Sequence, residues 1–316
     1  MNGTLWLAWR QQRLLILAGL LLVAGCAVWV VLERADLMAA VGGYDLSSCK
    51  GWNGACRSST EVAVFEHTPG IRVLGTASVL LPAVIGMFGG APLIGRELER
   101  GTVKVALTQG VGARSWFAAR FGLAALCAAV VSAAVAALLA WWWAPISNMQ
   151  NGVYWHDPYI LNGSGPAAVA CSLFALSAGT AIGLLVRRTL PAMGLTAVAV
   201  LGTTAFLTLF RRDFVSPTDR VTPGTTPKQL IGSAWSAGYR YLTPDGVQHP
   251  LENCTFSGEE LRACMAEHGY VGRVHKVYPS SDFWTFQALD TVVYLGLAAA
   301  LVALTAVLLH RRRHLV

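Results

Sequence analysis

The chain has 316 residues, of which 54% are hydrophobic and only 13% are charged. Soluble globular domains carry about 25% charged residues, so this composition excludes an ordinary soluble protein. The formal net charge of +7 requires no nucleic-acid partner, because an excess of Lys and Arg is typical of the cytoplasmic ends of membrane spans.

The N-terminal segment 1–13 predicts a short helix in the membrane interface. It contains the indoles of Trp6 and Trp9, followed by the polar residues Gln11, Gln12 and Arg13. Tryptophan is enriched at the headgroup level of membranes, where its ring is half apolar and half polar.

Six later segments are long and apolar enough to cross a membrane. About 20 apolar residues are needed to span the hydrocarbon core, and this length is met by 14–32, 73–94, 117–143, 167–186, 190–210 and 288–309. Each must be helical, because lipid offers no partner for an unpaired backbone N–H or C=O. The sequence therefore predicts an all-α polytopic membrane protein with six transmembrane helices, five of them within 14–210.

The basic residues predict that both termini are cytoplasmic. With that orientation most Lys and Arg near the span ends fall inside, including the basic tail at 310–316. Nearly all acidic residues then lie in the outer loops. Arg211 and Arg212, at the outer end of the fifth span, are the main exception, and we expect them to face the outer loop or lipid headgroups.

One long inner loop is expected, at 95–116 between the second and third spans. It holds Glu97 and Glu99, the only two cytoplasmic carboxylates of this topology, next to arginines. One interpretation is a solvated connection rich in interfacial arginine. The other is a docking surface for a partner protein.

The span interiors are expected to contain no ionisable residue, with Asp290 at the outer edge of the last span. This disfavours an ion-coupled carrier, because such carriers hold their coupling ion on intramembrane charges.

Two Gly-xxx-Gly pairs, at Gly86/Gly90 and Gly179/Gly183, allow close helix approach. The threonines of the fifth span either bond to their own helix or line a path for an amphipathic substrate.

The largest outer loop, 213–287, is long enough for a small extracellular subdomain; the other two outer loops are 33–72 and 144–166. The stretch 216–227 is rich in Pro and Thr and predicts an extended linker. Thr243-Pro244-Asp245-Gly246 predicts a turn, and a capping box at 257–260 predicts a helix that closes at Gly269.

Four cysteines are placed outside, where oxidising conditions favour disulfides. The pairs are close in sequence, and we expect the bridges Cys49–Cys56 and Cys254–Cys264. Neither pair has the ligand spacing of a zinc site, so no metal site is predicted. His156 and His275 are among the outer histidines, which we expect at the surface.

The chain lacks the motifs for ATP chemistry. No lysine follows a glycine, so a G-x-x-x-x-G-K-[ST] phosphate loop is impossible. No histidine is followed by glutamate, which excludes an H-E-x-x-H zinc site. The chain is therefore expected to be no enzyme and to bind no cofactor; energy for uphill transport would come from elsewhere.

These features together resemble the membrane subunit of type-2 ATP-binding-cassette (ABC-2) exporters. The likeness covers essentially the whole chain and lies in the topology and two motifs. The first is R-E-L-E-R-G-T at 96–102 with L-T-Q at 107–109 and R-S-W at 114–116, in a form common in actinobacterial permeases; the second is F-W-T-F-Q at 283–287. One departure is Arg114, since such permeases often have Ser-Arg one residue earlier.

The resemblance implies a partner and a set of functional residues. Two permease copies, as a homodimer or with a paralogue, would dock on two copies of a separate ABC ATPase subunit, which holds ATP and Mg. The coupling residues would be Arg96, Glu97, Glu99, Arg100, Gly101, Thr102, Gln109 and Arg114. The second and fifth spans would flank the substrate path, with the candidate lining residues Met87, Phe88, Thr203, Thr204, Phe206, Thr208 and Phe210.

The resemblance favours a multi-pass permease of the bacterial plasma membrane, exporting a hydrophobic or amphipathic substrate. The alternative is a membrane receptor or scaffold whose outer loop binds a ligand without transport. That alternative predicts no ATPase partner, so co-purification distinguishes the two.

Overall fold

The computed structural model describes residues 3–41, 58–99, 113–147, 153–223, 234–250, 254 and 258–313. Six of its helices are long and apolar enough to cross a membrane, which confirms the predicted number of spans. These membrane-crossing stretches are Gln12–Val41, Val64–Glu99, Trp116–Ile146, Gly165–Val186, Thr189–Phe214 and Ser280–Arg311.

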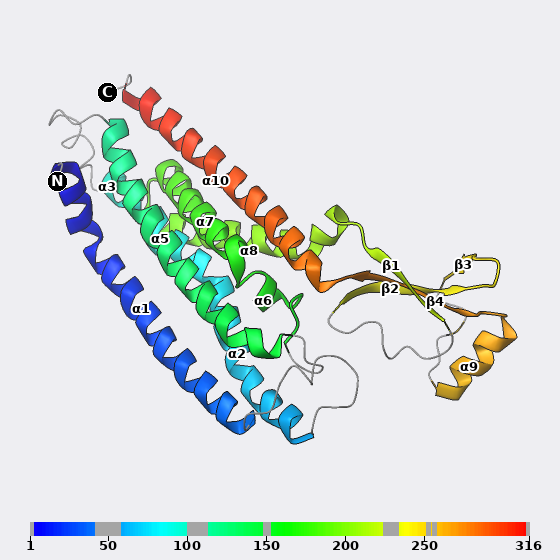
Figure 1. The fold of residues 1–316 in the computed structure, drawn as a ribbon. Coiled ribbons are helices and arrows are strands. Elements are labelled where there is room, and N and C mark those ends of the chain that lie inside the picture. Colours follow the sequence, from blue (N-terminus) through cyan, green and yellow to red (C-terminus); the bar gives the residue numbers. More distant parts are fainter. Residues whose placement is uncertain are drawn as a thin grey trace.

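The six spans form one bundle from which a small sheet projects (Figure 1). The helices are α1 (Gly3–Val41), α2 (Ser58–Ile85), η2 (Gly86–Gly90), α3 (Ala91–Glu99), α5 (Ala113–Trp143), η3 (Ala144–Ile146), α6 (Pro158–Leu161), α7 (Gly165–Val186), α8 (Thr189–Phe210), η4 (Arg211–Phe214), η6 (Ser280–Asp282) and α10 (Phe283–Arg313). We call the end where α1 begins and α10 ends the terminal end, and the opposite end the sheet end.

The helices extend further than the apolar segments. Helix α1 continues to Val41 and α2 begins at Ser58, so much of the expected outer loop 33–72 is helical. At the terminal end α3 continues to Glu99, so the first part of the expected loop 95–116 is helical as well. The sequence prediction was too short because it followed the apolar runs, whereas a helix continues through polar residues once its backbone bonds are formed.

The expected boundary at residue 13 is not a helix end, because α1 runs without interruption from Gly3 to Val41. An interfacial location of its first turns stays a prediction. The link between α7 and α8 is tight and turns at Arg187 and Arg188. Arg187 has a φ of 57° and caps the last turn of α7 with its N–H on the Gly183 carbonyl.

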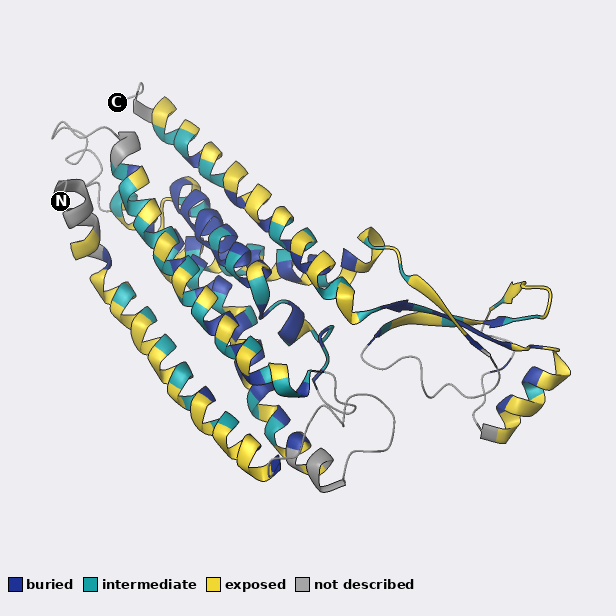
Figure 2. Cartoon of the chain, in the orientation of Figure 1, coloured by how far each residue is buried: buried dark blue, intermediate teal, exposed yellow. Residues whose placement is uncertain are grey.

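Helix α7 is the centre of the bundle (Figure 2). In its apolar window 72% of the residues are buried, against 6% in α1. The reason is its small residues, which pack directly against the backbone of η2 and α3. A methyl group added at Gly86 would lie 2.7 Å from the Ala175 carbonyl oxygen, and one added at Gly183 would lie 2.5 Å from that of Ala91. The two Gly-xxx-Gly pairs therefore face each other within one chain.

The segment 213–287, predicted to form an outer subdomain, contains an antiparallel sheet, so the prediction of an all-α fold was wrong in this part. The sheet has four strands in the order β1-β4-β2-β3: β1 (Thr218–Pro223), β2 (Trp235–Leu242), β3 (Gln248–His249) and β4 (Gly272–Tyr278). Strand β1 lies in the stretch expected to be a linker. Its Pro223 terminates an edge strand, where the missing N–H costs no ladder bond.

The turn and the helix predicted in this subdomain are present. The Gly246 N–H donates to the Thr243 carbonyl at 3.0 Å, which closes the turn between β2 and β3. Helix α9 (Gly258–Glu267) ends just before Gly269, whose φ is +67°. A disulfide joins Cys254 to Cys264 on α9. The expected Cys49–Cys56 bridge lies outside the described residues.

An aromatic cluster fixes the sheet to the bundle. Trp155, Tyr278 and Phe286 are buried and surround Trp235, the first residue of β2. The Arg212 guanidinium stacks over the Trp235 ring at 3.9 Å from its centroid, and the His156 ring stacks on its indole with centroids 5.4 Å apart. The sheet, α10 and the segment before α6 are therefore held together at the sheet end.

Candidate functional site

The residues predicted to line the substrate path lie in three separate places. Thr204 and Thr208 belong to a polar cluster between α8 and α10, at the sheet end. Phe206 and Phe210 lie on the exposed face of α8, with ring centroids 4.8 Å apart. Phe88 lines an apolar cavity on the far side of α2.

The contacts of the two remaining residues, Thr203 and Met87, do not indicate that they line a substrate path. The Thr203 hydroxyl donates to the Ala199 carbonyl of its own helix at 2.8 Å, and Met87 is half-buried in η2. The structure thus does not bring the seven residues together within one chain.

The centre of the polar cluster is an ion pair between two spans. Arg211, at the end of α8, donates to Asp290 of α10 at 2.9 Å, and both side chains are 2% exposed. The expectation that Arg211 faces the outer loop or headgroups was wrong. Arg211 directly follows the predicted span 190–210, and Asp290 lies near the start of the predicted span 288–309, so the absence of ionisable residues from the span interiors stays a prediction. Each charge is tolerated in its buried position because the other neutralises it.

Neutral polar groups complete the site around this ion pair. The Arg211 guanidinium also donates to the Thr208 hydroxyl at 2.9 Å and to the Asn162 side-chain oxygen. Asn162 follows α6 and donates its own amide to Thr208 at 3.0 Å. Nothing in the sequence motifs assigned Asn162, Arg211 or Asp290 to the site. The available signal was a pair of opposite charges at the ends of two spans that follow each other in the chain.

One oxygen of the cluster has no protein partner in the part of the chain described. Asp290 Oδ1 is buried and accepts no hydrogen bond. It borders a cavity of about 10 Å³ that is also lined by Thr204, Cys171 and Tyr294. That volume is close to the minimum for one water molecule. A water molecule there would complete the hydrogen bonding of the Asp290 carboxylate.

At the terminal end, Glu97 ties α3 to α5 and α1. Its carboxylate forms an ion pair with Arg120, and that guanidinium lies over the Trp116 ring at 4.8 Å from its centroid. The backbone carbonyl of Arg120 in turn accepts from the buried Gln12 amide at 3.0 Å. Three spans are therefore joined through one turn of α5.

Glu99 ties α3 to α8. Its carboxylate accepts from the Thr189 backbone N–H at 3.2 Å and from the Thr189 hydroxyl at 2.7 Å. Thr189 is the first residue of α8, so the carboxylate lies at a helix N-terminus, where free N–H groups and the helix dipole favour negative charge. Both carboxylates of the predicted coupling segment thus contact other spans.

The remaining coupling residues divide into described and undescribed positions. Arg96 lies in the last turn of α3. Arg114 is in the first turn of α5, but its side chain is outside the description. Outside it altogether lie Arg100, Gly101, Thr102 and Gln109.

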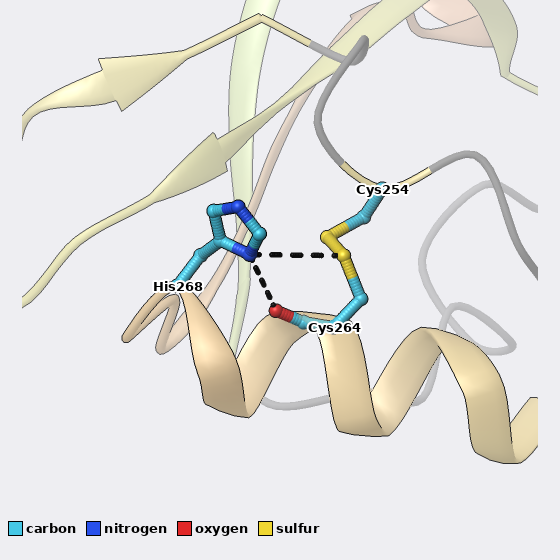
Figure 3. Close-up of side chains that lie close together, drawn as sticks. All are labelled: Cys254, Cys264 and His268. Atoms are coloured by element: carbon cyan, nitrogen blue, oxygen red, sulfur yellow. Dashed lines mark hydrogen bonds between the residues drawn. A yellow bond between two sulfur atoms is a disulfide. The ribbon is translucent and has the colours of Figure 1, made fainter.

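One cluster of potential metal ligands occurs among the described residues, in the sheet subdomain (Figure 3). The ligand atoms of Cys254, Cys264 and His268 lie within 4.8 Å of one another. The two sulfur atoms are bonded to each other, and a metal ligand requires a thiolate. The His268 ring instead contacts the Cys264 carbonyl at 3.0 Å. In this oxidised form Cys254 and Cys264 form a disulfide bond, and His268 lies beside it just after the end of α9.

The comparison with known families matches the chain to the model of the ABC-2 membrane transporter related family over residues 20–212. That range is more than half of the chain. The chain belongs to the ABC-2 membrane transporter related family. No curated protein matches it.

Membership of the ABC-2 family and six apolar helices together indicate the permease of an ABC transporter. The permease is the membrane component of such transporters, and the family implies an ABC ATPase as its partner. The matched range covers η2, α3 and α7 and ends at Arg212, so it includes Glu97, Glu99 and Arg211. Asp290 and the sheet lie outside it.

Proposed function

We propose that this chain is the permease subunit of an ABC exporter in a bacterial plasma membrane. It moves a hydrophobic or amphipathic substrate with ATP that a separate ATPase subunit hydrolyses. The observation that carries the proposal is the pair of contacts at the end of α3, Glu97 with Arg120 and Glu99 with Thr189. Through them the end of α3 is connected to α5 and α8.

The terminal end is the cytoplasmic end in this proposal. The ATPase contacts the segment 95–116, which includes the predicted coupling residues. A push there moves α3, and the two carboxylates transmit the movement to neighbouring spans. Transport proteins switch access by such rigid-body movement between two states.

The end of α3 is also connected to the rest of the bundle through continuous helical segments. Segments α2, η2 and α3 follow one another without a gap, and their glycines pack on the backbone of α7. Helix α7 packs against α10 through Ala170, Phe174 and Tyr294. The five-residue π-helix η2 lies at the glycine contact, and π-helical turns are frequent at functional sites.

The Arg211–Asp290 ion pair closes the sheet end in this mechanism. It joins the end of α8 to α10, the helix that carries the sheet. Outward release of substrate requires these helices to separate, and water that enters then solvates both charges. The closed state keeps them paired because an unpaired charge in a low-dielectric site costs several kcal/mol, about 3–5.

The complete transporter contains two permease copies, as a homodimer or with a paralogue, and two ATPase subunits that hold ATP and Mg. The substrate path runs along the exposed face of α8 that carries Phe206 and Phe210, where the second permease faces it. Aromatic rings at that position suit an amphipathic substrate, which presents both apolar and polar surface.

The test is purification of the chain from its native membranes in mild detergent, with identification of any co-purifying ABC ATPase and reconstitution of the two proteins in vesicles. We expect the ATPase to co-purify and inside-out vesicles to accumulate an amphipathic fluorescent dye only with ATP. Absence of any bound ATPase would support the receptor or scaffold alternative.

Orientation is tested separately with Val111→Cys in a background without the native free cysteines. A membrane-impermeant maleimide should label it in inside-out vesicles and not in intact cells. Labelling in intact cells would place the coupling segment outside and overturn the mechanism.

A further inference from the structure

A second cavity lies between α1, α2 and α5, in the half of the bundle near the terminal end. Its volume is about 430 Å³, within the range of about 300–1,000 Å³ that small-molecule sites occupy. Representative lining residues are Ile16, Gly19, Ile85, Leu123, Ala124 and Cys127. None of the predicted coupling residues lines it, and of the predicted path residues it includes Phe88 alone.

The cavity is almost entirely apolar and opens at the lipid-facing surface. Leu20, Phe88 and Leu126 line it and are 58%, 51% and 62% exposed, so they form its mouth. Trp9 and Gln12 lie at one end of the lining along α1. The Gln12 amide already donates to the Arg120 carbonyl.

The length of the cavity matches one leaflet. Its lining along α1 extends from Trp9 to Leu22, and the part from Gln12 to Leu22 is about 15 Å long at 1.5 Å per residue. The hydrocarbon core is about 30 Å thick. Trp9, 50% exposed, then lies where aromatic side chains meet the headgroups. The cavity therefore spans the hydrocarbon of the leaflet at the terminal end.

The walls of the cavity suit a hydrocarbon chain. A single flexible hydrocarbon chain is thinner than a helix and offers no polar backbone, which suits walls that provide few polar groups.

An arginine lies next to one end of the cavity lining. Arg13 is exposed and lies four residues after Trp9 and three before Ile16, so these three side chains share one helix face. The charge of nearby Arg120 is balanced by Glu97. The chain contains no acidic residue before Glu33. This part of α1 thus favours an anionic group at headgroup level.

We propose that this cavity binds one acyl chain of an anionic phospholipid from the terminal-end leaflet, with the lipid phosphate against Arg13. This site does not depend on the proposed transport function, since its walls are mostly those of α1, α2 and α5 and include none of the predicted coupling residues. A bound lipid there would fill the space between α1 and the rest of the bundle, which α1 otherwise contacts over few buried residues.

The experiment is native mass spectrometry of the full-length chain in mild detergent, with equal amounts of phosphatidylglycerol and phosphatidylcholine of the same acyl chains. We expect one phosphatidylglycerol to be retained in preference to phosphatidylcholine. Arg13→Gln should reduce that preference roughly fivefold, the contribution of one basic residue near an anionic membrane surface.

The second part of the experiment uses a variant in which a larger side chain fills the cavity. Ala124→Trp places an indole in the space and should reduce retention of both lipids to background. The matched control is Ala300→Trp on the exposed face of α10, which should retain lipid like the wild type. Arg13 is exposed, so its variant remains informative even if Ala124→Trp folds poorly.

Two results would overturn the proposal. Equal retention of the two lipids by the wild type would show that the site does not select an anionic headgroup. Unchanged lipid retention by a folded Ala124→Trp variant would show that the lipid does not bind in the cavity.

Discussion

The guanidinium of Arg211 lies 2.9 Å from the carboxylate of Asp290, between two helices that the sequence shows as apolar spans. The two residues are 79 positions apart, and the sheet subdomain lies between them in the chain. Their contact therefore brings together the two helices between which the sheet subdomain is inserted in the chain. It is also the strongest polar link between α8 and α10 among the described residues.

Breaking this pair on one side should be costly. Asp290→Ala leaves the Arg211 charge buried and unpaired, and we expect a loss of about 3–5 kcal/mol of stability. The double variant Arg211→Met/Asp290→Leu removes both charges and should recover most of that loss. Thermal unfolding in detergent measures the three proteins. Asp213→Asn, at an exposed carboxylate nearby, is the control, and an equal loss in that variant would contradict the argument.

The Glu99–Thr189 contact should affect coupling more than folding, because both groups are exposed. Thr189→Val keeps the backbone N–H but removes the hydroxyl donor, and Glu99→Arg removes the acceptor and reverses its charge. We expect transported substrate per ATP hydrolysed to fall about fivefold in Thr189→Val, at the low end of typical coupling energies, and further in Glu99→Arg. Vesicles with the ATPase give both rates. Unchanged ratios in both variants would remove this contact from the mechanism.

The glycine contact between η2 and α7 should tolerate no side chain. Gly86→Ala would bring a methyl group to 2.7 Å from the Ala175 carbonyl oxygen, and overpacking of this kind costs about 1–3 kcal/mol. Gly194→Ala in α8 is the matched control, since no atom lies within 4 Å of the added methyl group. There we expect a neutral or slightly stabilising effect, of about 0.4–1 kcal/mol at most. Equal melting temperatures for the two variants would argue against close packing at Gly86.

Acid should loosen the sheet from the bundle. His156 and His275 are not surface residues as expected: His156 is half-buried against Trp235, and His275 is 2% exposed within β4. Burial lowers the pKa of His156 below its usual value; the Asp157 charge opposes this shift and Arg212 adds to it. Burial also lowers the pKa of His275, with Arg273 acting in the same direction.

The sign of the pH effect follows from these lowered values. The folded protein favours neutral histidine, so this contribution to stability is fully present above the unfolded pKa of about 6.5 and is lost as the pH falls through the lowered folded values. We expect Trp fluorescence to report loosening of the sheet end at a higher pH in the wild type than in His156→Phe/His275→Phe. An identical acid profile in the two proteins would contradict this assignment.

The sequence alone determined the membrane class, the number of spans and the family. Apolar runs of about 20 residues can only be transmembrane helices, because lipid leaves no other way to satisfy the backbone, and that argument needs no tertiary contact. The turn at 243–246 and helix α9 were equally local, since their signals lie in neighbouring residues. The disulfide between Cys254 and Cys264 could be predicted because the two residues are separated by only 10 positions.

Only the tertiary structure decided which residues meet. Arg211 was expected in a loop or at headgroups because a charge at a span end usually escapes to water, and nothing local shows that Asp290 lies opposite. The glycine pairs carried no information about their partner, and the sheet was missed because its strands pair residues up to about 60 positions apart. Long-range contacts of this kind depend on how the helices pack, and a sequence pattern describes one helix at a time.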